Sequence, residues 1–135
     1  MVAASLLIVD DDAAIRESFG DYFEDHGYQV QLHECAETAL SSLQTLSCDL
    51  AIVDIRLGGM PGDEFIYQAH AVCHQCGFII CTGSPAYQMP AGLIALERVS
   101  SNVFQKPVVD LAELEHEVRR MLERLATRVV GHGED

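Results

Sequence analysis

Short apolar runs recur along the chain, and segments with helical periodicity lie between them. The runs at residues 6–9, 50–53 and 78–81 contain no polar residue apart from one cysteine. Unbroken runs of this length are typical of parallel strands that are covered on both faces. Between the runs, apolar residues recur at intervals of three and four, as in Phe19 and Phe23, which indicates amphipathic helices. The pattern therefore predicts alternating strands and helices.

Five strand–helix units account for nearly the whole chain. We predict strands over residues 5–9, 29–33, 50–53, 78–81 and 102–105. We predict helices over residues 13–26, 36–46, 63–76, 91–98 and 110–128. Right-handed crossovers between such units give a flavodoxin-like, doubly wound α/β fold with five parallel strands in the order 2-1-3-4-5.

The segment after the fourth strand is the least regular part of the pattern. Pro85 and Pro90 exclude one continuous helix there, so we expect a loop before the short fourth helix. We expect a single domain over residues 1–128, a flexible tail over residues 129–135 and no output domain in this chain.

The chain is strongly acidic, with a formal net charge of −13 at pH 7. This charge argues against nucleic acid and anionic membranes as partners, because both need a basic face. No apolar run reaches the roughly 20 residues of a membrane span, and the N-terminus lacks the basic region of a signal peptide. The chain has five cysteines, and this odd number indicates reduced thiols in the core. We therefore expect a cytoplasmic protein.

Chemically active side chains follow four of the predicted strands. An acidic triplet at residues 10–12 follows the first strand, and Asp54 follows the third. Thr82 follows the fourth strand, and Lys106, the only lysine of the chain, follows the fifth. The carboxyl ends of parallel strands lie side by side, so these groups should meet in one crevice. Clustered carboxylates beside an ammonium group suit Mg²⁺ and a phosphoryl group.

Neighbouring residues refine this crevice. Successive side chains of a strand point in opposite directions, so we expect Asp10 and Asp11 in the crevice and Asp12 as the N-cap of the first helix. Pro107 follows the lysine and predicts a cis Lys106–Pro107 bond, which would help to aim the ammonium group.

The residues around these positions resemble response-regulator receiver domains. Four motifs carry the resemblance in a fixed order: Leu7-Ile8-Val9-Asp10-Asp11-Asp12 with Arg16, Ile52-Val53-Asp54-Ile55-Arg56-Leu57 with Met60 and Gly62, Cys81-Thr82-Gly83, and Lys106-Pro107. The resemblance extends over about residues 6–125. Any one motif is a weak signal, whereas four in order on the expected strands are specific.

The resemblance implies that Asp54 is the phosphoacceptor, which takes a phosphoryl group from the phosphohistidine of a sensor histidine kinase or a phosphotransfer protein. It implies that Asp11 and Asp54 bind Mg²⁺ directly, together with the backbone carbonyl of Arg56. Asp10 would act mainly through a coordinated water. The acyl phosphate formed on a carboxylate is labile, which suits a resettable signal.

The resemblance also assigns the phosphoryl-binding residues. Thr82 and Lys106 would each bind a phosphoryl oxygen, and Gly83 would leave room for the group. Arg56 and Ser84 occupy positions that help to set the dephosphorylation rate in this family. We expect a signalling protein and not an enzyme, since it would catalyse only its own phosphorylation and dephosphorylation.

Receiver domains signal through the face formed by the fourth helix, the fifth strand and the fifth helix. The resemblance implies that an output protein, a lost effector domain or a second copy of the chain binds there. The usual aromatic position of the fifth strand holds Val103, and the adjacent Phe104 should point to the opposite face. We therefore expect the output to run through the loop after Thr82 or through the fourth helix alone.

Two other functions fit parts of the sequence. Asp10 and Asp12 match the Asp-x-Asp pattern of haloacid-dehalogenase-like phosphatases. However, Ala14 stands where those enzymes usually carry threonine or valine, and the chain is short for their cap. The other alternative is a pseudo-receiver, which binds a partner without being phosphorylated. Because all the predicted site residues are present, the pseudo-receiver is a weaker interpretation than the phosphorylated switch.

One further cluster suggests a metal site. It consists of His70, Cys73, His74 and Cys76. The cluster lies within a helix that must also pack, and no second ligand pair follows it. Core cysteines and surface histidines are therefore the better interpretation.

Overall fold

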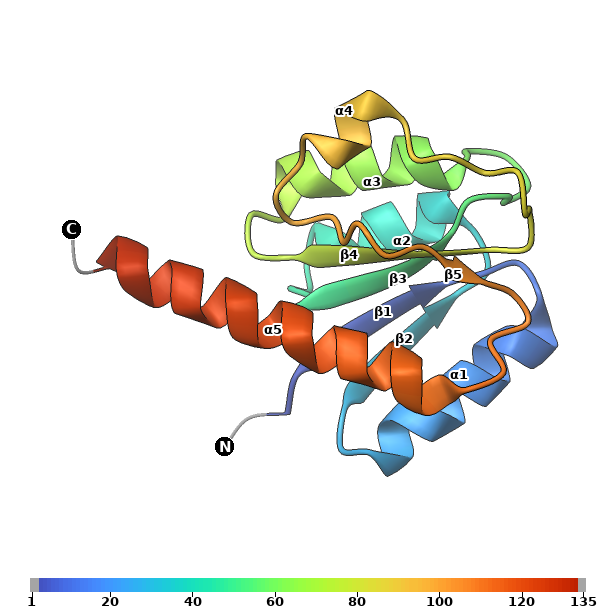
Figure 1. Ribbon diagram of the computed structural model, residues 1–135, viewed down its shortest axis with the longest axis horizontal. Coiled ribbons are helices and arrows are strands. Elements are labelled where there is room, and N and C mark those ends of the chain that lie inside the picture. Colours follow the sequence, from blue (N-terminus) through green and yellow to red (C-terminus); the bar gives the residue numbers. More distant parts are fainter. Residues whose placement is uncertain (1–2, 134–135) are drawn as a thin grey trace.

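The computed structural model describes residues 3–133 and describes side chains as far as residue 127. Its strands form one parallel sheet in the order β2-β1-β3-β4-β5 (Figure 1). The strands are β1 (Ser5–Val9), β2 (Gln29–His33), β3 (Leu50–Asp54), β4 (Gly77–Thr82) and β5 (Phe104–Gln105). The predicted flavodoxin-like, doubly wound α/β fold and its strand order are confirmed.

Helices cover both faces of the sheet. They are α1 (Ala13–Asp25), α2 (Ala36–Leu43), α3 (Gly62–Val72), α4 (Ala91–Ile94) and α5 (Leu111–Gly133). α1 and α5 lie on one face, and α2, α3 and α4 lie on the other (Figure 1). Each face has its own core: Phe23 and Val118 are buried on the first, and Phe65 and Leu93 on the second.

The strand register brings the carboxyl ends of the central strands together. β1 pairs with β3 so that Val9 lies opposite Val53, and β3 pairs with β4 so that Asp54 lies opposite Cys81. Every residue of β3 and β4 is buried, as their unbroken apolar runs indicate. Asp10 and Asp54 therefore emerge at the same edge of the sheet.

The fourth helix is shorter than expected. It spans only Ala91–Ile94, whereas the sequence predicts a helix to residue 98. The buried guanidinium of Arg98 donates to the carbonyl oxygens of Cys73 and Cys76 at 2.6 and 2.7 Å. The backbone before Arg98 must leave the helix for the guanidinium to reach these oxygens. The hydrogen bonds of Arg98 therefore outweigh the local helix propensity.

Other elements also end earlier or begin later than predicted, and α2 ends at Leu43 and not at residue 46. β5 begins at Phe104 and not at residue 102, because the backbone N–H of Asn102 donates to Oγ of Ser100 at 3.1 Å and is lost to the strand ladder. α3 ends at Val72 and not at residue 76, and the extended Cys73 follows it.

The last helix is longer than predicted, since α5 continues to Gly133, five residues past residue 128. No proline stands in this stretch, and glycine inside a helix costs only about 1 kcal/mol relative to alanine. The predicted flexible tail at residues 129–135 is therefore helical as far as Gly133, and residues 134–135 lie outside the described part of the chain. No described helix is both long and apolar enough to cross a membrane.

Candidate functional site

Three aspartates converge at the carboxyl end of the sheet. A carboxylate oxygen from each of Asp10, Asp11 and Asp54 lies within 4.8 Å of the other two. Asp10 and Asp54 are only 2% and 3% exposed, whereas Asp11 is exposed. Asp12 turns away from the group, and its Oδ1 accepts the backbone N–H of Ala14 at 2.9 Å. The predicted division between crevice and N-cap is confirmed.

Lys106 bridges two of these carboxylates. Its Nζ donates to Oδ2 of Asp10 at 2.9 Å and to Oδ2 of Asp54 at 3.0 Å. Its backbone N–H donates to the carbonyl oxygen of Thr82 at 2.8 Å, which anchors the end of β5 beside β4. The Lys106–Pro107 bond is cis, as predicted. The lysine side chain is 12% exposed, so water screens these ion pairs only weakly.

The pKa values of both ionic partners are raised, for different reasons. Burial raises the pKa of Asp54; hydrogen bonding by Lys106 opposes the rise, and the charge of Asp10 adds to it. Burial alone would lower the pKa of Lys106, but its hydrogen bonds to Asp10 and Asp54 raise it overall. One ammonium group thus pairs with two of the three clustered carboxylates, and a bound cation would relieve the remaining repulsion.

A tight loop after β3 fixes the position of Asp54. The N–H of Gly62 donates to the carbonyl oxygen of Ile55 at 3.0 Å. A Cβ at Gly62 would stand 2.2 Å from the backbone oxygen of Asp54, so only glycine permits this approach. Gly59 turns the loop with a φ of 87°. The N–H of Arg56 donates to Oδ1 of Asp54 at 3.1 Å and orients the carboxylate.

The loop after β4 forms the other wall of the site. Thr82 is fully buried, and its Oγ1 accepts the N–H of Ser84 at 3.1 Å. Oγ of Ser84 accepts a hydrogen bond of 3.3 Å from Nη2 of Arg56, which links the two loops. A Cβ at Gly83 would meet no atom within 4 Å, so the space beside it is open.

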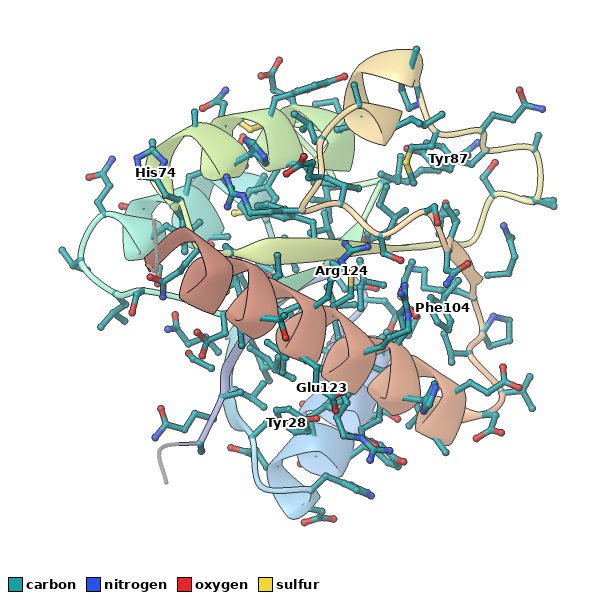
Figure 2. The ribbon with its side chains drawn as sticks, turned by 60° about the vertical axis from the view of Figure 1, so that its left-hand side comes forward. Tyr28, His74, Tyr87, Phe104, Glu123 and Arg124 are labelled. Atoms are coloured by element: carbon teal, nitrogen blue, oxygen red, sulfur yellow. The ribbon has the colours of Figure 1, made fainter. Side chains whose placement is uncertain are left out.

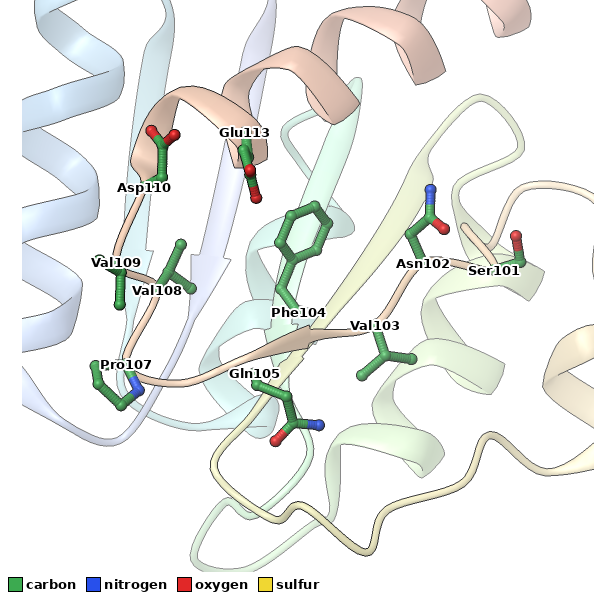
Figure 3. A pocket seen from close by; sticks show the side chains of 10 residues that line it. All are labelled: Ser101, Asn102, Val103, Phe104, Gln105, Pro107, Val108, Val109, Asp110 and Glu113. Atoms are coloured by element: carbon green, nitrogen blue, oxygen red, sulfur yellow. The ribbon is translucent and has the colours of Figure 1, made fainter.

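Val103 and Phe104 point to opposite sides of β5, as the sequence predicts. Val103 packs against the core beneath α2 and α3, and Phe104 packs against the core beneath α1 and α5. Phe104 extends toward Glu113 on α5 (Figure 3). Together with Val109, which is 95% exposed, these residues line a pocket of about 670 Å³ between β5 and the start of α5.

The aspartate group is a donor set suited to a hard cation. Mg²⁺ takes oxygen ligands and is usually held by one or two carboxylates plus waters and phosphate oxygens. Within the described residues, Asp10, Asp11 and Asp54 are the one group of three possible ligands whose atoms lie close enough to share an ion. Cys73 and Cys76 are buried in the core and belong to no such group.

Two contacts near the site were not predicted from the sequence. Nη1 of Arg16 donates to the backbone oxygen of Asp10 at 2.8 Å. The hydroxyl of Tyr87 donates to Oδ1 of Asp63 at 2.9 Å and ties the loop after β4 to α3. Figure 2 shows Tyr87 on this loop. Arg16 stands one helical turn after the capping residue Asp12, a spacing that places it near the end of β1. No local pattern pairs Tyr87 with Asp63.

Residues 6–119 match the family model of the response regulator receiver domain. This match covers most of the chain, so the chain belongs to the receiver-domain family of two-component response regulators. The resemblance drawn from the four motifs is thereby confirmed. The expected domain boundary at residue 128 stays a prediction.

The chain is similar to parts of longer curated regulators. It is 28% identical over 105 residues to the transcriptional regulatory protein FixJ of Bradyrhizobium diazoefficiens. This alignment covers 78% of this chain and 50% of FixJ. It is 45% identical over 58 residues to the heme response regulator HssR of Staphylococcus saprophyticus. This alignment covers 43% of this chain and 26% of HssR. The chain thus spans about half or less of the length of these relatives.

Solved receiver domains share the fold closely. A CheY-like response regulator receiver domain protein of Methanospirillum hungatei superposes with a TM-score of 0.83 at 27% identity, over 94% of this chain and 99% of that one. The response regulator TrrA of Thermotoga maritima, solved in complex with Mg(2+)-BeF, superposes with a TM-score of 0.76 at 24% identity, over 87% of this chain and 98% of that one.

Proposed function

We propose that this chain is a phosphoacceptor switch of a two-component system and that it is phosphorylated on Asp54 with Mg²⁺ bound beside it. The observation that carries the proposal is the meeting of Asp10, Asp11 and Asp54 with Lys106 at the carboxyl edge of the sheet. The Mg(2+)-BeF complex of the structural relative TrrA supports it.

Phosphoryl transfer would use the carboxylate of Asp54 as the nucleophile. One of its oxygens attacks the phosphorus of a partner's phosphohistidine, the P–N bond breaks, and an acyl phosphate forms on Asp54. Transfer of this kind depends on positioning and charge stabilisation more than on covalent machinery. Lys106 already lies 3.0 Å from Oδ2 of Asp54, within reach of a phosphoryl oxygen bound there. The buried hydroxyl of Thr82 would donate to another.

The residues that would hold the cation surround this nucleophile. Asp11 and Asp54 would bind Mg²⁺ directly with the backbone carbonyl of Arg56, and Asp10 would act through a coordinated water. Bound Mg²⁺ would supply positive charge that stabilises the negative phosphoryl oxygens. The exposure of Asp11 leaves this side open to water and to the phosphodonor.

The signal would leave the site through the loop after β4. If Thr82 turns its hydroxyl toward a phosphoryl oxygen, the N–H of Ser84 loses its present acceptor, Oγ1 of Thr82. The contact between Ser84 and Arg56 would then rearrange as well. Both residues stand where they would also set the dephosphorylation rate. This route needs no aromatic residue at Val103.

The output surface would be the face formed by α4, β5 and α5. α4 has only four residues, so β5 and α5 with their pocket would make up most of it. Partners would be a sensor histidine kinase or a phosphotransfer protein on the input side, and an output protein, an effector domain or a second copy of the chain at this face. We place this exchange in the cytoplasm.

A phosphatase function has less support from the geometry. In a haloacid-dehalogenase-like enzyme Asp10 would be the nucleophile and Asp12 would be the second catalytic carboxylate. Asp12 caps α1 and is not available as the second catalytic carboxylate.

Labelling with a small phosphodonor tests the proposal. The protein is incubated with Mg²⁺ and acetyl phosphate, and its intact mass is measured. We expect one added phosphoryl group in the wild type and none in Asp54→Asn. Asp12→Asn, which keeps an N-cap, is the matched control and should be labelled like the wild type. Labelling that persists in Asp54→Asn would contradict the proposal, and failure of the wild type to be labelled would favour a pseudo-receiver.

A further inference from the structure

Three cysteines converge at the edge of the sheet opposite the aspartates. Cys48 precedes β3, Cys73 follows α3, and Cys76 precedes β4. All three are free thiols and are buried. Because Asp54 stands at the other end of β3, this cluster of thiols, Cys48, Cys73 and Cys76, is separate from the phosphorylation site.

Two of these thiols are in direct contact. Sγ of Cys48 lies 3.3 Å from Sγ of Cys76. β3 and β4 are paired with Leu50 opposite Gly77, so the two cysteines lie on adjacent chain segments at the start of neighbouring strands. Adjacent strands are about 4.8 Å apart, and disulfides join residues whose Cα atoms lie roughly 4.4–6.8 Å apart. Side-chain rotation can therefore bring these two sulfurs to bonding distance with little movement of the backbone.

The third thiol is the one nearest to solvent. Cys73 is 7% exposed, whereas Cys48 and Cys76 are 1% and 0% exposed. The thiol of Cys73 donates to the backbone oxygen of Cys48 at 3.7 Å, so it lies against the same segment. A small oxidant that reaches this cluster meets Cys73 first.

We propose that Cys48 and Cys76 form a reversible disulfide when a hydroperoxide reaches the cluster, with Cys73 as the thiol that reacts first. The contact between two sulfurs, with a third and more exposed thiol beside them, indicates a modification site.

The reaction balances with hydrogen peroxide as the oxidant. The Cys73 thiolate attacks one peroxide oxygen, the O–O bond breaks, and Cys73 becomes a sulfenic acid while the leaving hydroxide takes up a proton to give water. The sulfur of Cys76 attacks the sulfur of Cys73, and a second water leaves. The sulfur of Cys48 then attacks that of Cys76, the proton of Cys48 passes to water, and the Cys73 thiolate is released. Two thiols have lost two hydrogen atoms in all, and the peroxide has been reduced to two waters.

The ionisation of Cys73 agrees with this order of events. The neighbouring thiol of Cys76 lowers the pKa of Cys73 to about 5, although burial opposes the shift. The pKa of Cys76 is raised. The thiolate is the reactive form of cysteine, so Cys73 is the group prepared to attack a peroxide near neutral pH.

Mass spectrometry of the folded protein tests the proposal. The protein is treated with hydrogen peroxide, free thiols are alkylated, and trypsin is added. Arg16, Arg56 and Arg98 place Cys48 and Cys76 on different tryptic peptides. We expect the intact mass to fall by two hydrogens, the two peptides to be linked, and fragment ions to place the bond between Cys48 and Cys76. Dithiothreitol should restore the free thiols.

Alanine variants separate the roles of the three thiols. Cys76→Ala should lose the link, and Cys73→Ala should still form it but at least about tenfold more slowly. Cys35→Ala, which removes a thiol outside the cluster, and Asp54→Asn should behave like the wild type, so the result does not depend on phosphorylation.

Several results would overturn the proposal. They are a link through Cys35, a wild-type product oxidised only on Cys73, an unchanged rate in Cys73→Ala, and an unmodified protein. If Cys76→Ala does not fold, the fragment ions of the wild-type product still decide the question.

Discussion

Lys106 and Asp54 are separated by 52 residues in the sequence, yet Nζ of the lysine lies 3.0 Å from Oδ2 of the aspartate. The same ammonium group lies 2.9 Å from Oδ2 of Asp10. Both carboxylates are nearly inaccessible to water, so the lysine is the main source of positive charge for two buried anions. It thereby contributes to stability as well as to the proposed chemistry.

Removal of this ammonium group should destabilise the metal-free protein. Lys106→Met leaves two buried carboxylates without their partner, and loss of one member of a buried ion pair costs about 3–5 kcal/mol. Urea denaturation at pH 7 measures the effect. Arg119→Met is the control, because the side chain of Arg119 is 58% exposed and its buried partner Glu115 keeps the hydrogen bond from the hydroxyl of Tyr28. That change should cost no more than about 1 kcal/mol; equal losses in the two variants would contradict the prediction.

The stability of the metal-free site should depend on pH through Asp54. Its pKa is raised in the folded protein, so the folded state binds a proton at Asp54 more readily than the unfolded state does. The contribution of this group to the free energy of unfolding therefore increases as the pH falls through the raised pKa, and it is least favourable above it.

Asp54→Asn removes this charge and should be more stable than the wild type at pH 7. The difference should shrink as the pH is lowered through the raised pKa of Asp54. Thermal unfolding with a chelator present, between neutral pH and about pH 4, near the ordinary pKa of aspartate, measures both curves. A difference that does not vary with pH would show that the charge of Asp54 is not the cause.

The loop after β3 should tolerate a methyl group at one glycine and not at another. Gly62→Ala places a Cβ 2.2 Å from the backbone oxygen of Asp54. The strand end must then shift, at a cost of about 1–3 kcal/mol, and phosphorylation should slow because Asp54 moves. Gly58→Ala is the matched control, since a Cβ there meets nothing within 4 Å. Denaturation and acetyl phosphate labelling should separate the two variants clearly; similar behaviour would count against this role of Gly62.

The hydrogen bond from Tyr87 to Asp63 should couple the loop after β4 to α3. A double-mutant cycle with Tyr87→Phe and Asp63→Ala measures this coupling from the free energies of unfolding. We expect about 0.5–1.5 kcal/mol, the usual net value of one hydrogen bond. The cycle cancels the separate effect of removing an acidic residue from the first turn of α3. A coupling near zero would mean that the two residues do not hold the loop.

The central strands and the acidic group were predictable because their signals are local. Runs of apolar residues mark β1, β3 and β4, and the first residues after them carry the chemistry. Parallel pairing then brings Asp10, Asp54 and Thr82 to one edge without further information. The N-cap role of Asp12 follows from its place before the first helical residue.

The errors arise where distant contacts decide the local structure. α4 ends early because Arg98 binds carbonyl oxygens at the end of α3. β5 starts late because Ser100 binds the N–H of Asn102. The contact between Cys48 and Cys76 depends on the pairing of β3 with β4, and the spacing of the cysteines along the chain gives no sign of it.

Chemical trapping of the phosphorylated residue is the most direct test of the central claim. The wild-type protein is phosphorylated with acetyl phosphate and Mg²⁺, and borohydride reduces the acyl phosphate to the alcohol of homoserine. Peptide sequencing by mass spectrometry then locates that homoserine. We predict homoserine in place of Asp54 alone; homoserine in place of Asp10 or Asp11, or its absence from a protein that has taken up phosphate, would contradict it.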